Sequence, residues 1–314
     1  MSPELPAAVR RAVGGVRRAR PSGFPWSAPS WPGGVERPAP AREVGVDYDT
    51  DWSRRYPARL VRAMVLDNVT RPMTHVLATP TVVGREVLEL VELPAIFVAN
   101  HSSHLDTPVL LSVLPARIRH KTVVAAAADH FFDRRWKAHL WALSLAAVPI
   151  ERHRVNRRSA DVAAALVEDG WNLVIYPEGG RTPDGWFQEF RGGAAYLAAR
   201  TGRPVVPVHL EGTYRILPKG ADRPRRHPVR VTFGTPMTLD DGEDARRFGT
   251  RIEATLGVLA DEAGSDWWTA RRRAAGGTTP SAHGPDATDW RRVWALGPPR
   301  PDDDDERRWA IRRD

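Results

Sequence analysis

A histidine and an aspartate five positions apart are the strongest chemical signal in this sequence. They are His101 and Asp106 of the string NHSSHLD, residues 100–106, which directly follows the apolar run Ala95 to Ala99. His101 is therefore expected where a buried strand ends. A carboxylate bonded to one imidazole nitrogen fixes the tautomer and leaves the other nitrogen free to take a proton from a hydroxyl. The pair predicts a general base that acts on a substrate alcohol.

The turn between these two side chains is expected to depend on Pro108. Because proline is favoured in the first turn of a helix, we expect a helix that begins near Pro108 and is capped by Asp106 or Thr107. In a simpler interpretation Asp106 is only this cap and His101 is an ordinary loop histidine. Either serine of the string is a further candidate, as a covalent nucleophile, but neither lies in a G-x-S-x-G elbow.

A second string, YPEGGRT at residues 176–182, also follows an apolar run. Its Arg181 offers a planar, permanently charged fork that suits phosphate, and Gly179 and Gly180 let backbone amides come close to an anion. Either string alone is a weak signal, since a His followed five positions later by Asp should arise about once by chance in a chain of this length. Two such strings at two strand ends predict a catalytic site beside an anion site.

At these residues the sequence resembles the glycerophospholipid acyltransferase family, typified by the 1-acylglycerol-3-phosphate acyltransferases. The first family motif is His, four residues, Asp, and the third is Phe or Tyr, Pro, Glu, Gly, Thr, Arg, Ser, from which Gly180 and Thr182 depart mildly. The resemblance implies that a fatty acyl group moves from the thioester of acyl-coenzyme A or acyl carrier protein to a hydroxyl of a lysophospholipid such as 1-acylglycerol-3-phosphate. It implies no metal and no cofactor.

Two further motifs keep the order that this family has. Ile150 to Arg152 resembles a motif that ends in Ile, any residue, Arg, although the usual upstream Gly is missing. Val206 to Val208 resembles a strand that begins with a hydrophobic residue and Pro. Order and spacing agree over about residues 82–233, so the two ends of the chain lie outside the resemblance.

The resemblance also implies roles in substrate binding. Arg152 and Arg181 are expected to bind the glycerol phosphate of the acceptor, and Glu178 to hydrogen-bond its hydroxyls or to support these arginines. Alternatively, Glu178 and Arg181 form an internal ion pair that only holds the turn. Arg191 lies where relatives often carry Lys, and it either reaches a coenzyme phosphate or is an exposed Arg beside a helix start. The expected substrate-binding residues are Arg152, Glu178, Gly179, Gly180, Arg181 and Arg191.

A metal-dependent hydrolase is the first alternative function. It would use His101, His104 and Asp106, which resemble the His-x-His-x-Asp-His cluster of binuclear zinc hydrolases. The spacing of the first His is one residue too long, and Thr107 stands where the last His is needed. Too few ligands are left, so we expect no metal site.

Composition limits the partners. The 314 residues are 42% hydrophobic, enough for a proper core, and the absence of Cys excludes disulfides, zinc–thiolate sites and a cysteine thioester. A formal net charge of +8 favours anionic partners such as phospholipid head groups, coenzyme A phosphates or nucleic acid. A non-catalytic basic nucleic-acid-binding protein is the second alternative, but no recognised motif supports it, so we expect no nucleic-acid partner.

The expected location is the cytoplasm. Residues 1–20 lack the apolar core of a secretory signal. The longest strongly apolar stretch, Leu140 to Ile150, is much shorter than the ~20 residues that cross a bilayer. We therefore expect peripheral contact with the inner face of a membrane, through helices between Asp51 and Leu77 that combine apolar and Arg side chains.

Three parts of the chain differ in character. Residues 1–45 form a Pro- and Arg-rich leader that is expected to be poorly ordered, residues 46–264 an acyltransferase domain, and residues 265–314 a Trp- and Arg-rich, largely non-globular tail with an acidic run. Short apolar runs alternate with helical patterns in the middle part, which predicts an α/β fold: a central mixed sheet of about seven strands, covered by helices, in a single domain.

The elements of this domain can be placed approximately. Strands are predicted at Val82 to Leu88, Ile96 to Ala99, Thr122 to Ala126, Ala147 to Ile150, Leu173 to Tyr176, Val205 to Leu210 and Val229 to Phe233. Helices are predicted at Asp133 to Leu145, Ser159 to Asp169, Gly193 to Arg200 and from about Asp244. One or two helices between Asp51 and Leu77 are expected to be interrupted near Pro72.

Overall fold

Seven strands form one mixed sheet in the computed structural model, which describes residues 44–151 and 157–284 apart from the side chains of Arg157 and Arg158. The strands are β1 (Thr81–Val83), β2 (Ile96–Ala99), β3 (Thr122–Ala127), β4 (Ala147–Ile150), β5 (Asn172–Ile175), β6 (Val205–Glu211) and β7 (Arg230–Phe233). Their order across the sheet is β1-β7-β6-β2-β5-β3-β4. The predicted α/β fold is confirmed, and each predicted strand overlaps an observed one.

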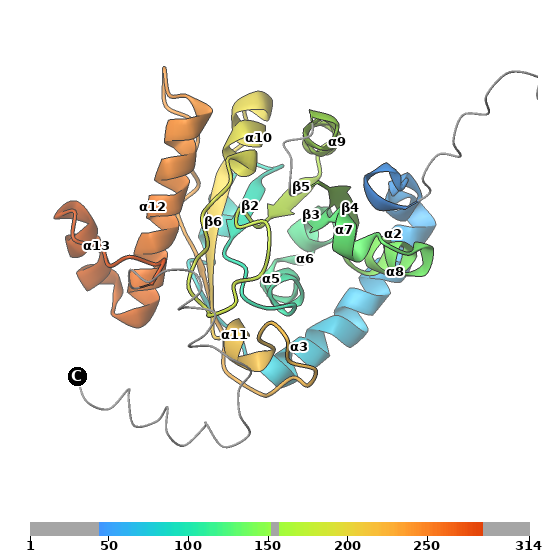
Figure 1. The fold of residues 1–314 in the computed structure, drawn as a ribbon, viewed down its shortest axis with the longest axis horizontal. Helices are drawn as coiled ribbons and strands as arrows, with labels where there is room; N and C mark the ends of the chain where they lie inside the picture. The colour runs from blue at the N-terminus through green and yellow to red at the C-terminus, as the bar shows by residue number, and fades with distance from the viewer. Residues whose placement is uncertain (1–43, 152–156, 285–314) are drawn as a thin grey trace, which may run out of the picture. The chain divides into compact units, whose positions relative to one another are not determined.

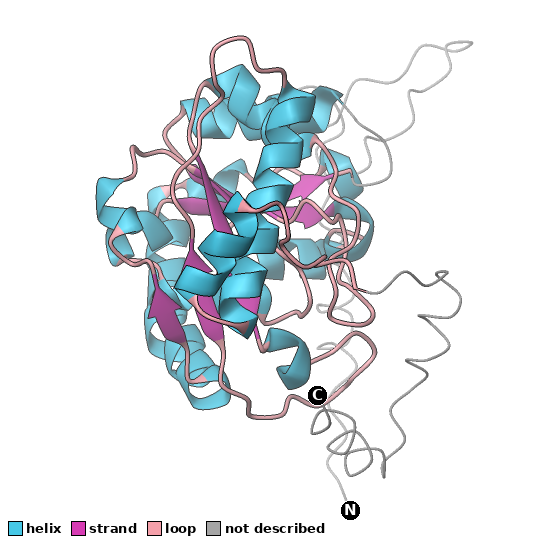
Figure 2. Ribbon diagram, turned by 90° about the vertical axis from the view of Figure 1, so that its left-hand side faces the viewer, coloured by secondary structure: helices cyan, strands magenta, loops and turns pink. Residues whose placement is uncertain are grey.

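The middle of the sheet is parallel. Strands β6, β2, β5, β3 and β4 run in one direction. Strand β7 is antiparallel to β6, and β1 pairs in parallel with β7. Figure 2 shows the strands changing direction across the sheet, as the right-handed twist of strands requires. Because parallel strands end at the same edge, the loops after β2 and β5 lie there together.

Helices cover both faces of this sheet (Figure 1). The longer ones are α2 (Tyr56–Val65), α3 (Arg71–Ala78), α5 (Asp106–Val113), α8 (Arg135–Leu145), α9 (Arg157–Glu168), α10 (Gly193–Thr201), α12 (Ala245–Gly264) and α13 (Trp267–Ala275), and the short ones are α4 (Val87–Leu90), α6 (Ala116–Arg119), α7 (Ala128–Phe131) and α11 (Thr213–Ile216). Phe97 and Ala99 of β2 pack on the face that α5 covers. Ile96 and Val98 pack on the opposite face, beneath α9, α10 and α12. This alternation is the period-2 pattern of a strand buried on both sides.

The predicted strand from Val82 to Leu88 is wrong in its second half. Strand β1 ends at Val83, and the chain turns at Gly84, whose φ is +74°. A Cβ at this position would lie 2.3 Å from the carbonyl oxygen of Phe233, so the turn requires glycine. Helix α4 follows in place of a longer strand. The sequence could not show this, because an apolar run this short fits a helical turn as well as a strand.

The helices predicted between Asp51 and Leu77 form one continuous helical segment. Helix α2 passes through a π-helical turn, Leu66–Thr70, into α3. Pro72 lies in the first turn of α3. It has no N–H, and its ring would clash with the carbonyl four residues back in a regular helix, so the wider turn accommodates it. The interruption predicted near Pro72 is therefore a change of helix type just before this residue and not a break in the helix.

Folded structure continues past residue 264, so the prediction of a non-globular tail is wrong for residues 265–284. Asp266 caps α13 by accepting a hydrogen bond from the backbone N–H of Thr269 at 2.9 Å. Arg273 of α13 pairs with Asp261 of α12 at 2.6 Å. A capping residue and two residues of opposite charge are too weak a sequence pattern to distinguish this helix from a non-globular tail. Residues 1–43 of the predicted leader and residues 285–314 of the predicted tail lie outside the described residues.

Candidate active site

Two loops meet at the carboxyl edge of the parallel strands. The loop after β2 carries His101, and the loop after its neighbour β5 carries Glu178. The register pairs Ile96 with Leu173, an offset of 77 positions that His101 and Glu178 keep. The chain leaves β2 through α5 on one face and β5 through α10 on the other. In open α/β sheets, ligands bind at the carboxyl ends of two neighbouring strands whose following loops leave to opposite faces of the sheet. The topology therefore places a ligand site at these two loops.

Asp106 is fully buried and holds the ring of His101. Nδ1 of His101 lies 2.8 Å from Oδ2 of Asp106. The same oxygen accepts hydrogen bonds from the backbone N–H groups of Ser102 at 2.7 Å and Ser103 at 2.8 Å. The structure therefore brings together the two side chains that the sequence singled out. The predicted helix cap is wrong, because α5 begins at Asp106 itself and its carboxylate binds the preceding loop instead.

The imidazole of His101 stacks on Tyr176. Their ring centroids are 4.2 Å apart, and the ring planes are inclined by 22°. The Tyr176 hydroxyl lies 2.9 Å from Oγ1 of Thr107, and burial, together with the charge of Asp106, raises its pKa so that it stays neutral. Nε2 of His101 makes no hydrogen bond with a described residue. That nitrogen is available to accept a proton.

Glu178 joins the two loops. It is 4% exposed, its Oε1 accepts a hydrogen bond from the backbone N–H of His101 at 2.6 Å, and its Oε2 accepts one from Gln188 at 3.0 Å. Burial raises the pKa of this carboxyl to about 8, although the two backbone hydrogen bonds lower it. The ion pair expected as an alternative between Glu178 and Arg181 is absent. Glu178 instead fixes the backbone that carries His101.

Gly179 allows an arginine to lie against the backbone of the second loop. Its φ is +68°, and a Cβ there would lie 2.9 Å from Nε of Arg191. The backbone N–H of Arg191 donates to the carbonyl of Pro177 at 2.9 Å, which brings the two segments together. The carbonyl of Gly180 accepts from Nε2 of Gln188 at 3.0 Å. Arg191 is itself exposed, so its guanidinium lies at the rim of the site.

Arg181 is a half-buried cation without a protein partner. Its guanidinium makes no hydrogen bond or ion pair with any residue in the described part of the chain, although Asp106 is close enough to raise its pKa against the lowering by burial. Burial lowers the pKa of His104 to about 4, and the charge of Arg181 is the second cause. His104 is therefore neutral at pH 7 and stacks near His130, with ring centroids 5.9 Å apart. The charge of Arg181 remains available to an anion.

Arg152, the other expected phosphate ligand, lies outside the described residues. Strand β4 ends at Ile150, two positions before it, as the apolar run predicts. Strand β4 is at the edge of the sheet, next to β3. The role of Arg152 beside Arg181 stays a prediction.

Comparison with known proteins finds similarity across the region that carries both strings. A family model described as Acyltransferase matches residues 79–211. The chloroplastic 1-acyl-sn-glycerol-3-phosphate acyltransferase of Brassica napus is 33% identical over 159 residues, 49% of this chain and 44% of that protein. The 1-acyl-sn-glycerol-3-phosphate acyltransferase of Cocos nucifera is 28% identical over 198 residues, 60% of each chain. Over about half of its length this chain is therefore similar to 1-acyl-sn-glycerol-3-phosphate acyltransferases.

A solved structure agrees with the fold of this chain. The 1-acyl-sn-glycerophosphate acyltransferase of Thermotoga maritima superposes with a TM-score of 0.53 over 69% of this chain and 84% of that one, at 22% identity. The chain spans about half the length of the curated relatives it matches, 44% and 60% in the two cases above.

The two serine hydroxyls of the first string form hydrogen bonds away from His101. Oγ of Ser102 lies 2.9 Å from Oγ1 of Thr213, and Oγ of Ser103 donates to the carbonyl of Leu217 at 2.9 Å. Both side chains are buried. Neither hydroxyl is placed to give its proton to the imidazole, so the site does not favour a covalent serine.

The metal-hydrolase alternative lacks a ligand set in the described part of this chain. Within residues 44–151 and 157–284, no three His, Asp or Glu side chains are grouped so that they could hold a metal ion. The ring of His104 packs near His130 and Phe131. It does not complete a cluster with His101 and Asp106.

Sequence reasoning missed three supporting residues. Tyr176 stands at the Phe or Tyr position of the second string, and the need for a flat ring against His101 is a signal that could have identified it. Asn100 bridges β2 to β6, since its Nδ2 donates to the carbonyl of Leu210 and its Oδ1 accepts from that residue's N–H. Gln188 follows no local pattern, and only the fold shows its contact with Glu178.

Proposed function

We propose that this acyltransferase moves a fatty acyl group from an acyl thioester to a hydroxyl of a lysophospholipid such as 1-acylglycerol-3-phosphate. Nε2 of His101 takes the hydroxyl proton while the oxygen attacks the thioester carbonyl. The C–S bond then breaks, and the proton on His101 goes to the departing sulfur of coenzyme A or acyl carrier protein. Asp106 stabilises the imidazolium between the two transfers. The hydrogen bond between the buried Asp106 and Nδ1 of His101, 2.8 Å long, carries the proposal.

The acceptor phosphate is assigned to Arg181. Its unpartnered, half-buried guanidinium can form two parallel hydrogen bonds to a phosphate, and these are stronger where water is partly excluded. Arg152 is proposed as a second ligand on the strength of the family resemblance. Of the two expected glycines, only Gly180 is proposed to offer its backbone N–H to an anion, because the N–H of Gly179 already donates to the carbonyl of Tyr176 at 3.1 Å. Arg191, exposed at the rim, is proposed to meet a phosphate of the donor.

Contact with a membrane surface is proposed for the α2–α3 segment. Its exposed apolar side chains are Tyr56, Leu60, Val61, Met64, Val69, Met73 and Val76. Arg55 and Arg59 are exposed on the same segment and suit anionic head groups. Across residues 44–151 and 157–284, no helix has the length and apolar character needed to span a bilayer. Both candidate donors are made inside the cell, so the inner face of the membrane is the proposed location.

The surface contact can be tested with vesicles. Met73→Glu places a charge on the apolar face and is expected to reduce retention on phosphatidylglycerol vesicles at low salt. Leu90→Glu is the control, because Leu90 is 83% exposed on α4, away from that segment. Equal retention of the two variants would reject the α2–α3 face.

The reaction is tested by thiol release from long-chain acyl-coenzyme A with and without 1-acylglycerol-3-phosphate. We expect acceptor-dependent release that falls by at least about 100-fold in His101→Ala, since a general base contributes that much or more. His227→Ala, a loop histidine outside both strings, is the matched control. Release that is unchanged in His101→Ala would reject the proposed base.

The other outcomes separate the remaining functions. Release without any acceptor dependence would indicate a thioesterase, and no release with either coenzyme A or acyl carrier protein as donor would reject the transferase. Salt-sensitive binding of DNA in such an inactive protein would support the nucleic-acid-binding alternative. For the phosphate, Arg181→Ala should raise KM for 1-acylglycerol-3-phosphate but not for a monoacylglycerol, which has no phosphate.

A further inference from the structure

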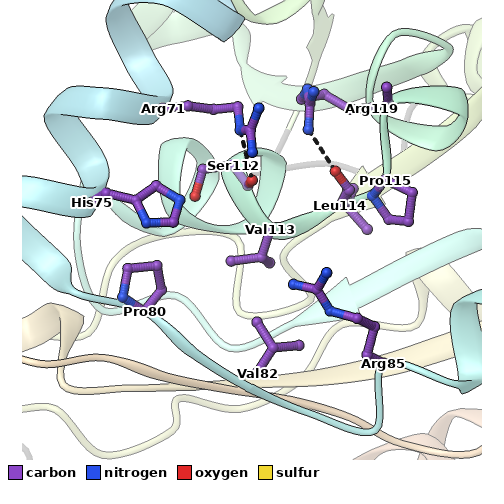
Figure 3. A pocket seen from close by; sticks show the side chains of 11 residues that line it. Arg71, His75, Pro80, Val82, Arg85, Ser112, Val113, Leu114, Pro115 and Arg119 are labelled. Carbon is purple, nitrogen blue, oxygen red and sulfur yellow. Dashed lines mark hydrogen bonds between the residues drawn. The ribbon is translucent and has the colours of Figure 1, made fainter.

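A cavity lies at the far end of helix α5 from the candidate active site (Figure 3). It has a volume of about 340 Å³, which is within the range of small-molecule sites, roughly 300–1,000 Å³. Its walls come from α3, from β1 and the turn after it, from the last turn of α5 and from α6. Asp106 is the first residue of α5, whereas Ser112 and Val113 of the cavity are in its last turn. No residue of the two motif strings lines it.

The charged groups of this cavity are all basic. Arg71, Arg85, Arg119 and His75 line it, and no carboxylate does. Figure 3 shows Arg71 and His75 entering from α3 and Arg85 from the opposite side. Arg85 is exposed, and its guanidinium makes no hydrogen bond or ion pair with any residue that the structure describes. The guanidinium of Arg85 can therefore offer all its N–H donors to a ligand in the cavity.

The two other arginines have structural partners that do not use all their donors. Nε of Arg71 donates to the carbonyl of Ser112 at 3.3 Å, and Nη1 of Arg119 donates to that of Leu114 at 2.6 Å, which satisfies carbonyls at the end of α5. Nη2 of Arg119 also pairs with Asp67 at 2.7 Å. Arg119 is nevertheless 5% exposed with a buried Nε that has no acceptor. A buried donor without a partner is costly and marks a place where an acceptor is missing.

The charges around the cavity do not cancel. Asp67 is the carboxylate that pairs with Arg119, and it is shared with His120, whose Nε2 lies 3.1 Å away. One shared carboxylate cannot neutralise three guanidinium groups. An anion with several oxygen acceptors would satisfy the remaining donors, and a planar guanidinium suits phosphate oxygens best.

We propose that this cavity binds a phosphate group, at a site separate from the catalytic one. Helix α3 supplies Arg71 to the cavity and also exposes Met73 and Val76, which are 46% and 53% exposed. Apolar side chains on the same helix favour the phosphate of a lipid head group over a free phosphate ester. The site would then hold the protein at an anionic surface through one specific contact. It does not depend on the acyl-transfer chemistry.

Calorimetric titration with inorganic phosphate and with glycerol 3-phosphate tests the cavity directly. Arg181→Ala in the full chain weakens the proposed acceptor site, and the part of the remaining binding that depends on Arg85 reports on the cavity. Adding Arg85→Glu should weaken this binding by about tenfold or more, whereas Arg272→Glu, the same charge change at an exposed position on α13, should not. Arg85→Lys, which keeps the charge but not the fork, should give a smaller loss, and equal unfolding midpoints would show that all variants fold.

Vesicles identify the source of the phosphate. Phosphatidylcholine vesicles with and without phosphatidic acid are compared for the Arg85→Glu and Arg272→Glu variants. If only Arg85→Glu abolishes the retention that depends on phosphatidic acid, the ligand is a lipid head group; if only soluble phosphate binding depends on Arg85, it is a free phosphate ester. If Arg85→Glu behaves like Arg272→Glu with both probes, the proposal is wrong. Neither assay measures acyl transfer, so a failure here is distinct from a failure of the proposed reaction.

Discussion

Oδ2 of Asp106 is the common acceptor for Nδ1 of His101, at 2.8 Å, and for two consecutive backbone N–H groups. One buried oxygen thus fixes both the ring and the loop that carries it. Its partner Oδ1 is buried without a hydrogen bond. The carboxylate therefore contributes a negative charge beside the imidazole as well as a geometric constraint.

Charge and geometry can be separated at Asp106. In Asp106→Asn the amide oxygen can still accept the three N–H bonds, but it no longer stabilises an imidazolium. We expect kcat/KM to fall by roughly 10²–10⁴-fold with little change in KM, since the loss is confined to proton transfer. Asp106→Ala should additionally lower the free energy of unfolding by about 1–3 kcal/mol per backbone N–H left unsatisfied. A fall in activity of the Asn variant that only matches its loss of folded protein would contradict this assignment.

Glu178 makes stability depend on pH in an unusual direction. Its pKa is about 8 in the folded protein because of burial, and 4.5 without the fold. Between these values the folded protein binds more protons than the unfolded chain, so the free energy of unfolding should fall as pH rises from about 4.5 to about 8. Urea denaturation across this pH range should show that the free energy of unfolding depends less on pH in Glu178→Gln than in the wild type. A wild-type slope equal to that of the variant would show that this carboxyl is ionised in the fold.

His104 gives the opposite dependence. Its pKa is lowered to about 4 by burial and by Arg181, so the folded protein binds fewer protons than the unfolded chain between about 4 and 6.5. Stability from this group should be present above pH 6.5 and lost as pH falls toward 4. His209, also buried with a pKa near 4, should add to the same acid loss. Denaturation of His104→Gln at several pH values should show a smaller acid loss than wild type.

His104 should also report on the charge of Arg181. Arg181→Ala removes the second cause of the lowered pKa, so the His104 pKa should rise in an NMR titration of the imidazole protons. A phosphate bound to Arg181 should move it in the same direction. The exposed Arg191→Ala is the control, since Arg191 is not among the causes of the shift. If neither the removal of Arg181 nor the addition of phosphate changes the pKa of His104, this arginine lies away from the site.

The sheet was predictable because its buried strands are continuous apolar runs that end in polar strings. Strands β2 and β4 were predicted with their observed limits. The predictions failed where the local structure depends on contacts between residues that are far apart in the sequence. Gly84 must turn because Phe233 of β7 approaches its backbone, and no local pattern near β1 contains that information. Helix α13 depends likewise on packing against α12 and on the pair between Arg273 and Asp261.

The active-site pair was predictable for a local reason, since only six residues separate the end of β2 from Asp106 at the start of α5 and leave few ways to place the His and the Asp. The role of Glu178 was not predictable from the local sequence. Its carboxylate serves the backbone of His101, 77 positions away, a contact set by the β2–β5 register. The cavity beside Arg85 was likewise hidden, because its arginines come from α3, the turn after β1, and α6. Charge composition alone could indicate an anionic partner but not its place.

Gly179 couples the second loop to Arg191. In Gly179→Ala the φ of +68° would be strained by about 1–2 kcal/mol, and the new Cβ would lie 2.9 Å from Nε of Arg191. Since Arg191 is exposed and flexible, it should move rather than the loop, so KM for the anionic acyl donor should rise while kcat changes less. Gly192→Ala is the matched control, because its φ is −69° and nothing lies within 4 Å of an added Cβ. Initial rates at varied acyl-coenzyme A should separate the two. A fall in kcat alone for Gly179→Ala would instead mean that the substitution disturbs the neighbouring Glu178 and, through it, His101.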